Sequence, residues 1–194
     1  MQSNAKSSIT PRAGPPPGYT VHEGFPPLPE YLDLRKLSGL TPVTSEQGAL
    51  VPSGSWFGVY ITADAEEDTI VDGQSSSNGT ATDPGNTHHR KAVAMGRIIG
   101  DGGWYFCIAD MAVLPDHQRK GLGDVIIKKL IERIDSHAAK GQAYVTLAAD
   151  GPGRRLYERN GFTESMPHSM GMKRLMQVGG KGGGVSEETV TTPE

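Results

Sequence analysis

A glycine-containing basic turn in front of a long helix carries the clearest chemical signal in the chain. Residues 118–124 have the sequence Gln-Arg-Lys-Gly-Leu-Gly-Asp and follow an apolar stretch that ends near a proline. The first amides of a helix have no partner inside the helix, and the helix dipole adds positive potential there. Gly121 and Gly123 carry no Cβ, so a phosphate can approach the backbone closely. The turn is therefore predicted to bind a phosphate-bearing ligand; the alternative is a solvated basic turn without a ligand.

Two widespread phosphate motifs do not fit this turn. The dinucleotide fingerprint needs a third glycine at position 126, where Ile126 stands. A P-loop ends in Gly-Lys followed by Ser or Thr, and that triplet does not occur in the chain. The signal thus favours a phosphate site of another kind.

The elements that must position this turn are a mixture of strands and helices. Alternating and short apolar segments predict strands over residues 19–23, 56–61, 92–99, 104–113, 144–148, 162–164 and 168–173. Helical spacing and capping signals, among them a capping box at Thr44 and Gln47, predict helices over 29–37, 44–50, 121–138 and 152–161. The buried face of the longest helix is predicted to be Leu122, Ile126, Leu130 and Ile134. This order predicts a mixed α/β domain around a central sheet.

Composition limits the domain and its partners. The 194 residues are 36% apolar and 21% charged, and three stretches rich in Gly, Pro or polar residues leave one folded domain over 18–177. Residues 1–17 and 178–194 are predicted to be flexible tails, and about 63–90 a polar loop insert. A net charge of −3 argues against nucleic acid or a membrane as the main partner. A single cysteine, Cys107, excludes an internal disulfide framework, and no metal site is expected.

Two motifs in order resemble one enzyme family. Gln118-x-x-Gly121-x-Gly123 is similar to the Q/R-x-x-G-x-G/A pyrophosphate motif of the GNAT superfamily of acetyl-CoA-dependent N-acetyltransferases. Ala112-Val113-x-Pro115, just before it, resembles the end of that family's fourth strand. The segment Leu-Tyr-Glu-Arg-Asn-Gly-Phe over 156–162 resembles the L-Y-E-x-x-G-F segment that follows its fifth strand. The resemblance is tightest over 92–173 and extends weakly to about residue 18.

The resemblance implies a fold and a cofactor site. The fold is a single α+β domain with flanking helices and a central, mostly antiparallel sheet whose fourth and fifth strands splay apart. The pantetheine arm of acetyl-CoA lies in that gap, and the pyrophosphate rests on the amides of the basic turn. Asp150 stands where many relatives carry Asn, and Gly153 replaces a common Ala. These two departures affect the side-chain contacts to the pantetheine and leave the pyrophosphate site unchanged. The implied cofactor-binding residues are Met111, Ala112, Val113, Gln118, Arg119, Lys120, Gly121, Leu122, Gly123, Asp124, Asp150 and Gly153.

The resemblance also implies a catalytic residue, Tyr157, which would hydrogen-bond the departing sulfur and protonate it. A phenol near pKa 10 and a thiol near 8.5 make full proton transfer uphill by about 2 kcal/mol, so hydrogen-bond donation is the expected role. The alternative for Tyr157 is a buried aromatic side chain. Asp110 precedes the splayed strand end and has three roles open to it: general base, anchor for the acceptor's charge, or structural partner of an arginine.

The remaining candidates have simpler explanations. His88 and His89 are predicted at the surface, and Cys107 in the core rather than as a nucleophile. Four aromatic residues flanking the strands are predicted in the core or at its rim, where some could line an acceptor pocket: Trp56, Tyr60, Trp104 and Tyr105.

The function expected from these observations is acetyl transfer from acetyl-CoA to a primary amine by direct attack on the thioester. Helices at 29–50 and the 63–90 loop stand where the family builds its acceptor site and can cover it, which favours a small-molecule amine over a protein. A protein lysine or N-terminal acetyltransferase is the first alternative, and a CoA-binding module without turnover is the second. Retention of Tyr157 together with the glycine pattern argues against the second. The expected compartment is the cytoplasm, with the nucleus and a homodimer left open.

Overall fold

A computed structural model describes residues 14–64, 90–167, 169, 171–172 and 174–176. Most of the predicted tails and loop insert, with His88 and His89, lies outside the described residues. The chain divides into two compact units, Met1–Thr163 and Glu164–Glu194, and all the helices and strands belong to the first. The described residues of the second unit carry no helix or strand, and within it the Ser169 amide donates to the Ser165 carbonyl.

Five strands form one sheet in chain order, β1-β2-β3-β4-β5. They are β1 (Tyr19–Glu23), β2 (Phe57–Ala63), β3 (Ala92–Gly100), β4 (Tyr105–Val113) and β5 (Tyr144–Leu147). Neighbours from β1 to β4 are antiparallel, and β4 with β5 is parallel. The β4–β5 ladder runs from Tyr105–Tyr144 to Ile108–Leu147 and ends there, so the second half of β4 has no partner in β5. This is the splay that the family resemblance implies, and the predicted fold class is confirmed.

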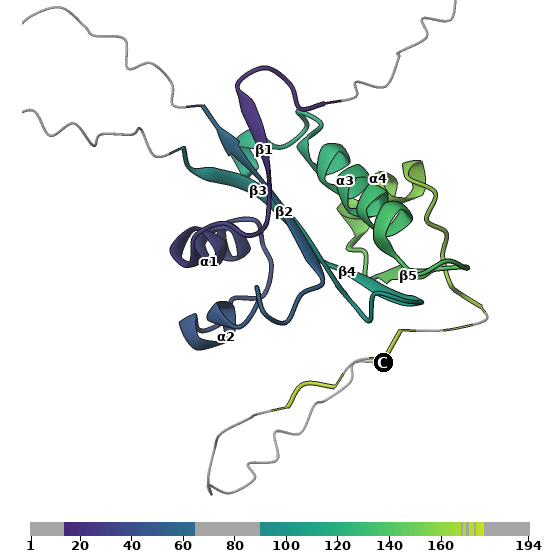
Figure 1. The fold of residues 1–194 in the computed structure, drawn as a ribbon. Helices are drawn as coiled ribbons and strands as arrows, with labels where there is room; N and C mark the ends of the chain where they lie inside the picture. Colours follow the sequence, from purple (N-terminus) through teal and green to yellow (C-terminus); the bar gives the residue numbers. More distant parts are fainter. Residues whose placement is uncertain (1–13, 65–89, 168, 170, 173, 177–194) are drawn as a thin grey trace, which may run out of the picture. The chain divides into compact units, whose positions relative to one another are not determined.

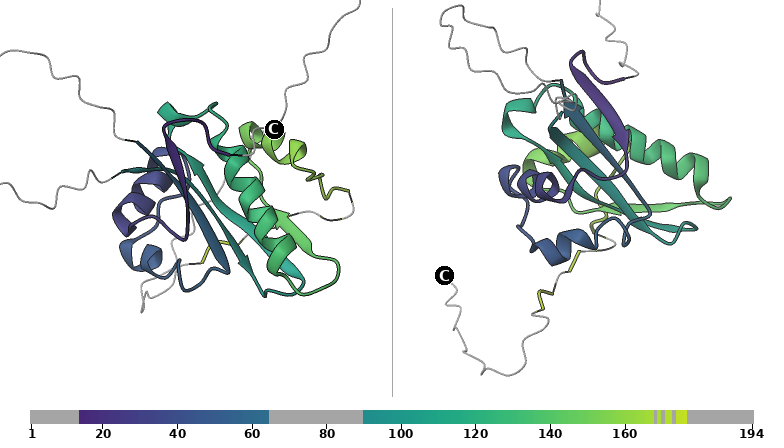
Figure 2. Two further views of the ribbon diagram at one scale, coloured as in Figure 1. Left: turned by 45° about the horizontal axis from the view of Figure 1, so that its top comes forward. Right: turned by 60° about the vertical axis from the view of Figure 1, so that its left-hand side comes forward.

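Helices cover both faces of the sheet (Figures 1 and 2). On one face lie α1 (Leu28–Leu37) and α2 (Ser45–Ala49), and on the other α3 (Leu122–His137) and α4 (Arg154–Arg159). Two 3-10 turns, η1 (Pro115–His117) and η2 (Gly151–Gly153), precede α3 and α4. The predicted capping box begins α2, with Thr44 Oγ1 accepting from the Gln47 amide at 3.2 Å. Each face therefore has its own hydrophobic cluster.

The larger cluster lies between the sheet and α3. All four residues predicted for the buried face of this helix are at most 5% exposed, and Phe106 and Ile108 of β4 meet them from the sheet. The smaller cluster joins α1 to the opposite face through Tyr31, Leu34, Ala92, Met95 and Ala112. The two clusters share the sheet and use different side chains of it.

A β-bulge in β4 decides which of its side chains belongs to which cluster. Met95 pairs with Ala112 but Arg97 pairs with Ala109, so Asp110 and Met111 together oppose Gly96. Asp110 has a φ of 53°, in the left-handed region. An extra residue reverses the alternation of a strand beyond it. Before the bulge Ile108 packs on α3; beyond it Met111 faces the α3 side, and Asp110 and Ala112 turn toward α1.

The strand predicted over 162–164 is wrong, and the end of α4 explains why. The Phe162 amide donates to the Tyr157 carbonyl at 3.1 Å, and the Gly161 amide to the Glu158 carbonyl at 3.1 Å, with Gly161 at a φ of 85°. This pair of bonds is a Schellman helix ending. The backbone of Phe162 is thereby committed to a helix end, and residues 162–164 form no strand. The strand predicted over 168–173 lies partly outside the described residues, and its described members form none.

Candidate functional site

The basic turn leaves the start of α3 uncovered. Arg119 has a φ of 58° and Gly121, the N-cap of the helix, a φ of 86°. No side chain caps this helix end, and a Cβ placed on Gly121 would meet nothing within 4 Å. The Asp124 and Val125 amides donate to the Gly121 carbonyl, which leaves the amides of Leu122 and Gly123 as the helix donors without a backbone acceptor inside the helix. The turn therefore presents backbone donors and the positive end of a four-turn helix. No side chain of the turn covers them.

Gly121 and Gly123 meet different surroundings. A Cβ on Gly123 would lie 3.2 Å from Leu156 Cδ2, so its absence lets α4 pack closely on the first turn of α3. The sequence alone explained glycine at both positions in the same way, by the close approach of a phosphate. The structure adds the approach of α4 as a reason for Gly123.

Two polar side chains of the turn bind the scaffold. Gln118 Nε2 donates to the Val113 carbonyl at 3.1 Å, which ties the turn to the end of β4. Asp124 accepts from Asn160 Nδ2 at 2.9 Å, and this bond ties the end of α4 to the first turn of α3. Asp124 also pairs with Lys128 Nζ, one turn further along α3, at 2.5 Å. The side chains of Arg119 and Lys120, by contrast, are exposed.

Tyr157 belongs to α4, next to the Leu156 that packs on Gly123 of this turn. Its ring packs edge-on against Phe162 with centroids 6.1 Å apart, and a Cβ on Gly153 would lie 3.3 Å from the ring. The hydroxyl has no hydrogen-bond partner within the described part of the chain. Burial, and after it the Asp150 carboxylate, raises the pKa of the phenol. Tyr157 therefore stays protonated at neutral pH with an uncommitted O–H.

The candidates Met111, Ala112 and Val113 lie on the half of β4 that β5 does not pair. Asp150 is exposed, and its carbonyl accepts from the amides of Gly153 and Arg154 at the start of α4. These residues thus border the gap between β4 and β5 on both sides.

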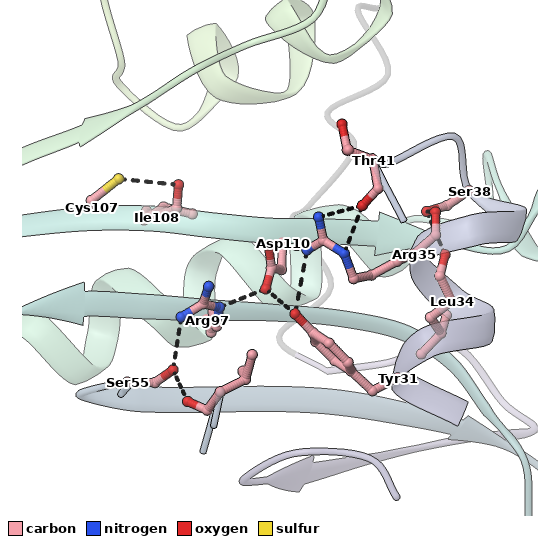
Figure 3. A network of polar contacts seen from close by, with 11 residues as sticks. Tyr31, Leu34, Arg35, Ser38, Thr41, Ser55, Arg97, Cys107, Ile108 and Asp110 are labelled. Atoms are coloured by element: carbon pink, nitrogen blue, oxygen red, sulfur yellow. Dashed lines mark hydrogen bonds and ion pairs between the residues drawn. The ribbon is translucent and has the colours of Figure 1, made fainter. Parts of the chain in front are cut away.

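Asp110 lies on the other face, in a network of four side chains (Figure 3). Its Oδ1 meets Arg35 Nη1 at 2.5 Å, and its Oδ2 accepts from Arg97 Nε at 2.6 Å and from the Tyr31 hydroxyl at 2.6 Å. The three charged side chains are only 11–16% exposed. Burial alone would raise the pKa of Asp110, but the bonds from Tyr31 and Arg97 and the two guanidinium charges hold it below its usual value. Both carboxylate oxygens are therefore engaged, and the group is ionised.

Comparison with known proteins identifies the fold. Residues 85–164 match the family model described as an acetyltransferase (GNAT) domain. Residues 85–164 thus carry a GNAT acetyltransferase domain. GNAT proteins are acyltransferases, and the motifs named from the sequence all lie within the matched region. No curated protein matches the chain in sequence.

Solved structures agree with this assignment. A protein of unknown function from methicillin-resistant Staphylococcus aureus, titled a probable acetyltransferase, is 28% identical, with a TM-score of 0.64 over 81% of this chain and 99% of that one. The ribosomal-protein-S18-alanine N-acetyltransferase of Escherichia coli is 19% identical, with a TM-score of 0.52 over 76% and 79%. Glucosamine-6-phosphate N-acetyltransferase of Arabidopsis thaliana is 15% identical, with a TM-score of 0.53 over 82% and 99%. The last two likenesses show the fold alone.

Sequence reasoning missed the partners of Asp110 in this GNAT domain. Tyr31 and Arg35 come from α1, 79 and 75 residues away in sequence. Arg97 stands in β3 between apolar neighbours, where an arginine needs a buried partner, and that was the available signal. Arg97 also donates to Ser55 Oγ at 3.0 Å.

The other candidates of the GNAT domain are scaffold or surface. Burial raises the pKa of the half-buried Cys107 thiol, which disfavours the thiolate that a nucleophile needs. Trp56 packs on Phe106 in the core, whereas Trp104 and Tyr105 are exposed and contact Tyr144. In the described residues, no three His, Cys, Asp or Glu side chains gather as metal ligands, and no helix is long and apolar enough to cross a membrane.

The Asp110 network should make the stability of the GNAT domain depend on acid pH. A carboxylate with a lowered folded-state pKa stabilises the fold fully above the unfolded-state value near 4, and this contribution disappears as pH falls through the folded-state value. Urea unfolding of the wild type and Asp110→Asn at pH 7, 5, 3.5 and 2.5 should give a difference that shrinks as pH falls below about 4. A difference independent of pH would show that this carboxylate does not contribute through its charge.

Proposed function

We propose that this GNAT domain transfers the acetyl group of acetyl-CoA to a primary amine of a small molecule. The observation that carries the proposal is the attachment of α4 to the first turn of α3, through Leu156 on Gly123 and through Asn160 on Asp124. This attachment fastens α4, the helix that carries the uncommitted phenol of Tyr157, to an uncovered helix start. Anion-binding amides and a proton donor on adjoining elements suit a thioester carried by a nucleotide diphosphate.

The residues of the turn fit the diphosphate part of acetyl-CoA. Amides of residues 119–123 would hold its oxygens, since Gly121 places no side chain over them and the Asp124 amide already donates to the Gly121 carbonyl. The edge of β4 that β5 leaves unpaired, at Met111, Ala112 and Val113, would hold the pantetheine arm, whose amides need partners at a strand edge. The Val113 carbonyl already accepts from Gln118. When bound, acetyl-CoA supplies an activated acyl group.

Tyr157 is assigned the donation of a hydrogen bond to the sulfur as negative charge develops on it. The raised pKa of the phenol makes complete proton transfer to a thiolate less favourable than it is for free tyrosine. A hydrogen bond to a charged acceptor stabilises it without that transfer. Tyr157 is therefore a donor to the leaving group rather than a strong acid.

Asp110 is assigned a positioning role. A general base needs a free oxygen and a pKa near the working pH. Asp110 has neither, since three donors occupy its oxygens and its pKa is lowered. Its bonds to Arg35 and Tyr31 fasten α1 over β4, which places α1 beside the acceptor side of the reacting group.

Measuring thiol release from acetyl-CoA with a panel of amines, together with mass spectrometry of the products, tests the proposal. We expect thiol release that depends on an added small amine and an acetylamide product. Acetylation of peptides alone would overturn the small-molecule assignment. Acetyl-CoA binding with no transfer to any amine would indicate a module without turnover.

Replacing the phenol should lower turnover selectively. Tyr157→Phe is expected to reduce kcat by about 10- to 100-fold, below the roughly 100- to 10,000-fold typical of full proton donors, because only a hydrogen bond is lost. The dissociation constant of acetyl-CoA, measured by calorimetry, should change less than about threefold. Tyr144→Phe is the matched control, since Tyr144 is an exposed tyrosine of β5, and should keep wild-type kcat. An unchanged kcat in Tyr157→Phe would remove this residue from the mechanism.

A further inference from the structure

A pocket of about 260 Å³ lies on the α1–α2 face of the sheet, between the loop after β1 and the end of α2. Its walls are mostly hydrocarbon, and its lining contains no charged residue: Phe25, Pro26, Leu28, Tyr31, Gly48, Ala49, Val51 and Pro52. The hydroxyl of Tyr31 is bonded to Asp110 and so offers little polarity to an occupant. This apolar pocket plays no part in holding acetyl-CoA as described above.

The lining of the apolar pocket overlaps that of a second, much smaller gap at the bulge of β4. This gap shares Phe25, Pro26 and Tyr31 with the pocket and is also lined by Gly96, Arg97 and Asp110. Asp110 is the bulged residue, and just before it β4 loses its pairing with β5. An occupant of the pocket would therefore lie on the opposite face of the sheet from α3, with its Tyr31 end nearer the bulge.

A second ammonium group would find no counter-charge in the apolar pocket, because no charged residue lines it. Arg35 and Arg97 carry two positive charges against the single negative charge of Asp110, and all three are largely buried. Asp110 thus has no free oxygen for another cation. A phosphate or a hydroxylated ring would also lose its hydration in the apolar pocket without gaining hydrogen bonds from its walls.

We propose that the apolar pocket binds the hydrocarbon part of the acceptor, so that the substrate class is a primary monoamine with one compact apolar group. The inference rests on the proposed function and specifies its acceptor. A dry cavity of about 150 Å³ suffices for benzene in a well-studied case, so about 260 Å³ holds one aromatic ring with a short linker or a branched alkyl chain. The amine would then lie at the end of the pocket that Tyr31 shares with the gap at Asp110.

A comparison of matched amines tests the substrate class. With acetyl-CoA saturating, kcat/KM should be at least about 30-fold higher for 2-phenylethylamine and isopentylamine than for spermidine and glucosamine 6-phosphate. A preference for either polar amine would overturn the inference while leaving acetyl transfer intact. If no amine releases thiol, the proposed function fails instead, and binding of 2-phenylethylamine, observed by ligand NMR, then decides whether the pocket takes apolar amines.

A larger side chain in the apolar pocket should weaken binding of the apolar amine and leave acetyl-CoA binding unchanged. Ala49→Phe is expected to raise KM for 2-phenylethylamine at least tenfold and to abolish its NMR-detected binding, with the acetyl-CoA dissociation constant unchanged. Ala139→Phe, the same change at an exposed alanine beyond α3, is the control and should match wild type. Val51→Ala enlarges the pocket and should shift the preference toward bulkier amines, an outcome that does not depend on the folding of Ala49→Phe. Wild-type KM and binding in Ala49→Phe, or an unshifted preference in Val51→Ala, would place the acceptor elsewhere.

Discussion

Gly121→Val should weaken acetyl-CoA binding at least about 100-fold. Gly121 has a φ of 86° at the uncovered start of α3, so a branched side chain both strains the turn and stands over the amides. Two hydrogen bonds to a charged diphosphate, at about 1.5 kcal/mol or more each, correspond to a factor of this size at 1.4 kcal/mol per tenfold. Calorimetric titration with CoA measures it directly.

The control for this prediction is Gly39→Val. Gly39 has the same φ of 86° and nothing within 4 Å of an added Cβ, but it follows α1 on the other face of the sheet. Both variants should lose comparable stability in thermal unfolding, and only Gly121→Val should lose CoA. Retained binding in Gly121→Val would mean that the turn does not hold the diphosphate.

Asp110→Asn should destabilise the domain by about 3–5 kcal/mol, the range for breaking a buried ion pair and leaving its partners unpaired. Two guanidinium groups, 12% and 16% exposed, would keep their positive charges with no anion between them. Asparagine tolerates the left-handed φ of this position well, so the loss would come from charge rather than from the backbone. Urea unfolding at pH 7 gives the free-energy difference.

An exposed ion pair of α1, the helix that Asp110 holds to the sheet, provides the comparison. Asp33 of α1 lies 4.0 Å from Lys91, with both side chains more than half exposed. Asp33→Asn should cost less than about 1 kcal/mol, because solvent screens such pairs. If Asp110→Asn costs no more than Asp33→Asn, the network does not hold α1 to the sheet.

Local patterns predicted the elements of the fold well. The spacing of Leu122, Ile126, Leu130 and Ile134 gave the face of α3, and Thr44 with Gln47 gave the capping box of α2. Each of these signals depends on residues within a few positions of each other, which is why the chain alone reveals them. The splay of β4 and β5 came from the family resemblance and is confirmed by where their pairing ends.

Features made by distant parts of the chain escaped prediction. Asp110 was named, but Tyr31 and Arg35 reach it from an element some 75 residues earlier, and no local pattern links them. The strand predicted at 162–164 was wrong for a different, local reason. An apolar Phe162 after Gly161 fits a strand locally, but its contact with Tyr157 makes it the end of a helix. The roles of Tyr157 and of the turn residues in catalysis and cofactor binding stay predictions.

The bulge at Asp110 has a consequence for how this gene can vary. Gaining or losing one codon between Tyr105 and Val113 would exchange the side chains of β4 that face α3 with those that face α1, beyond that point. Met111 would move from the α3 cluster to the α1 side, and Asp110 or its replacement would enter an apolar core. Natural variants of this strand should therefore differ by substitution and hardly ever in length.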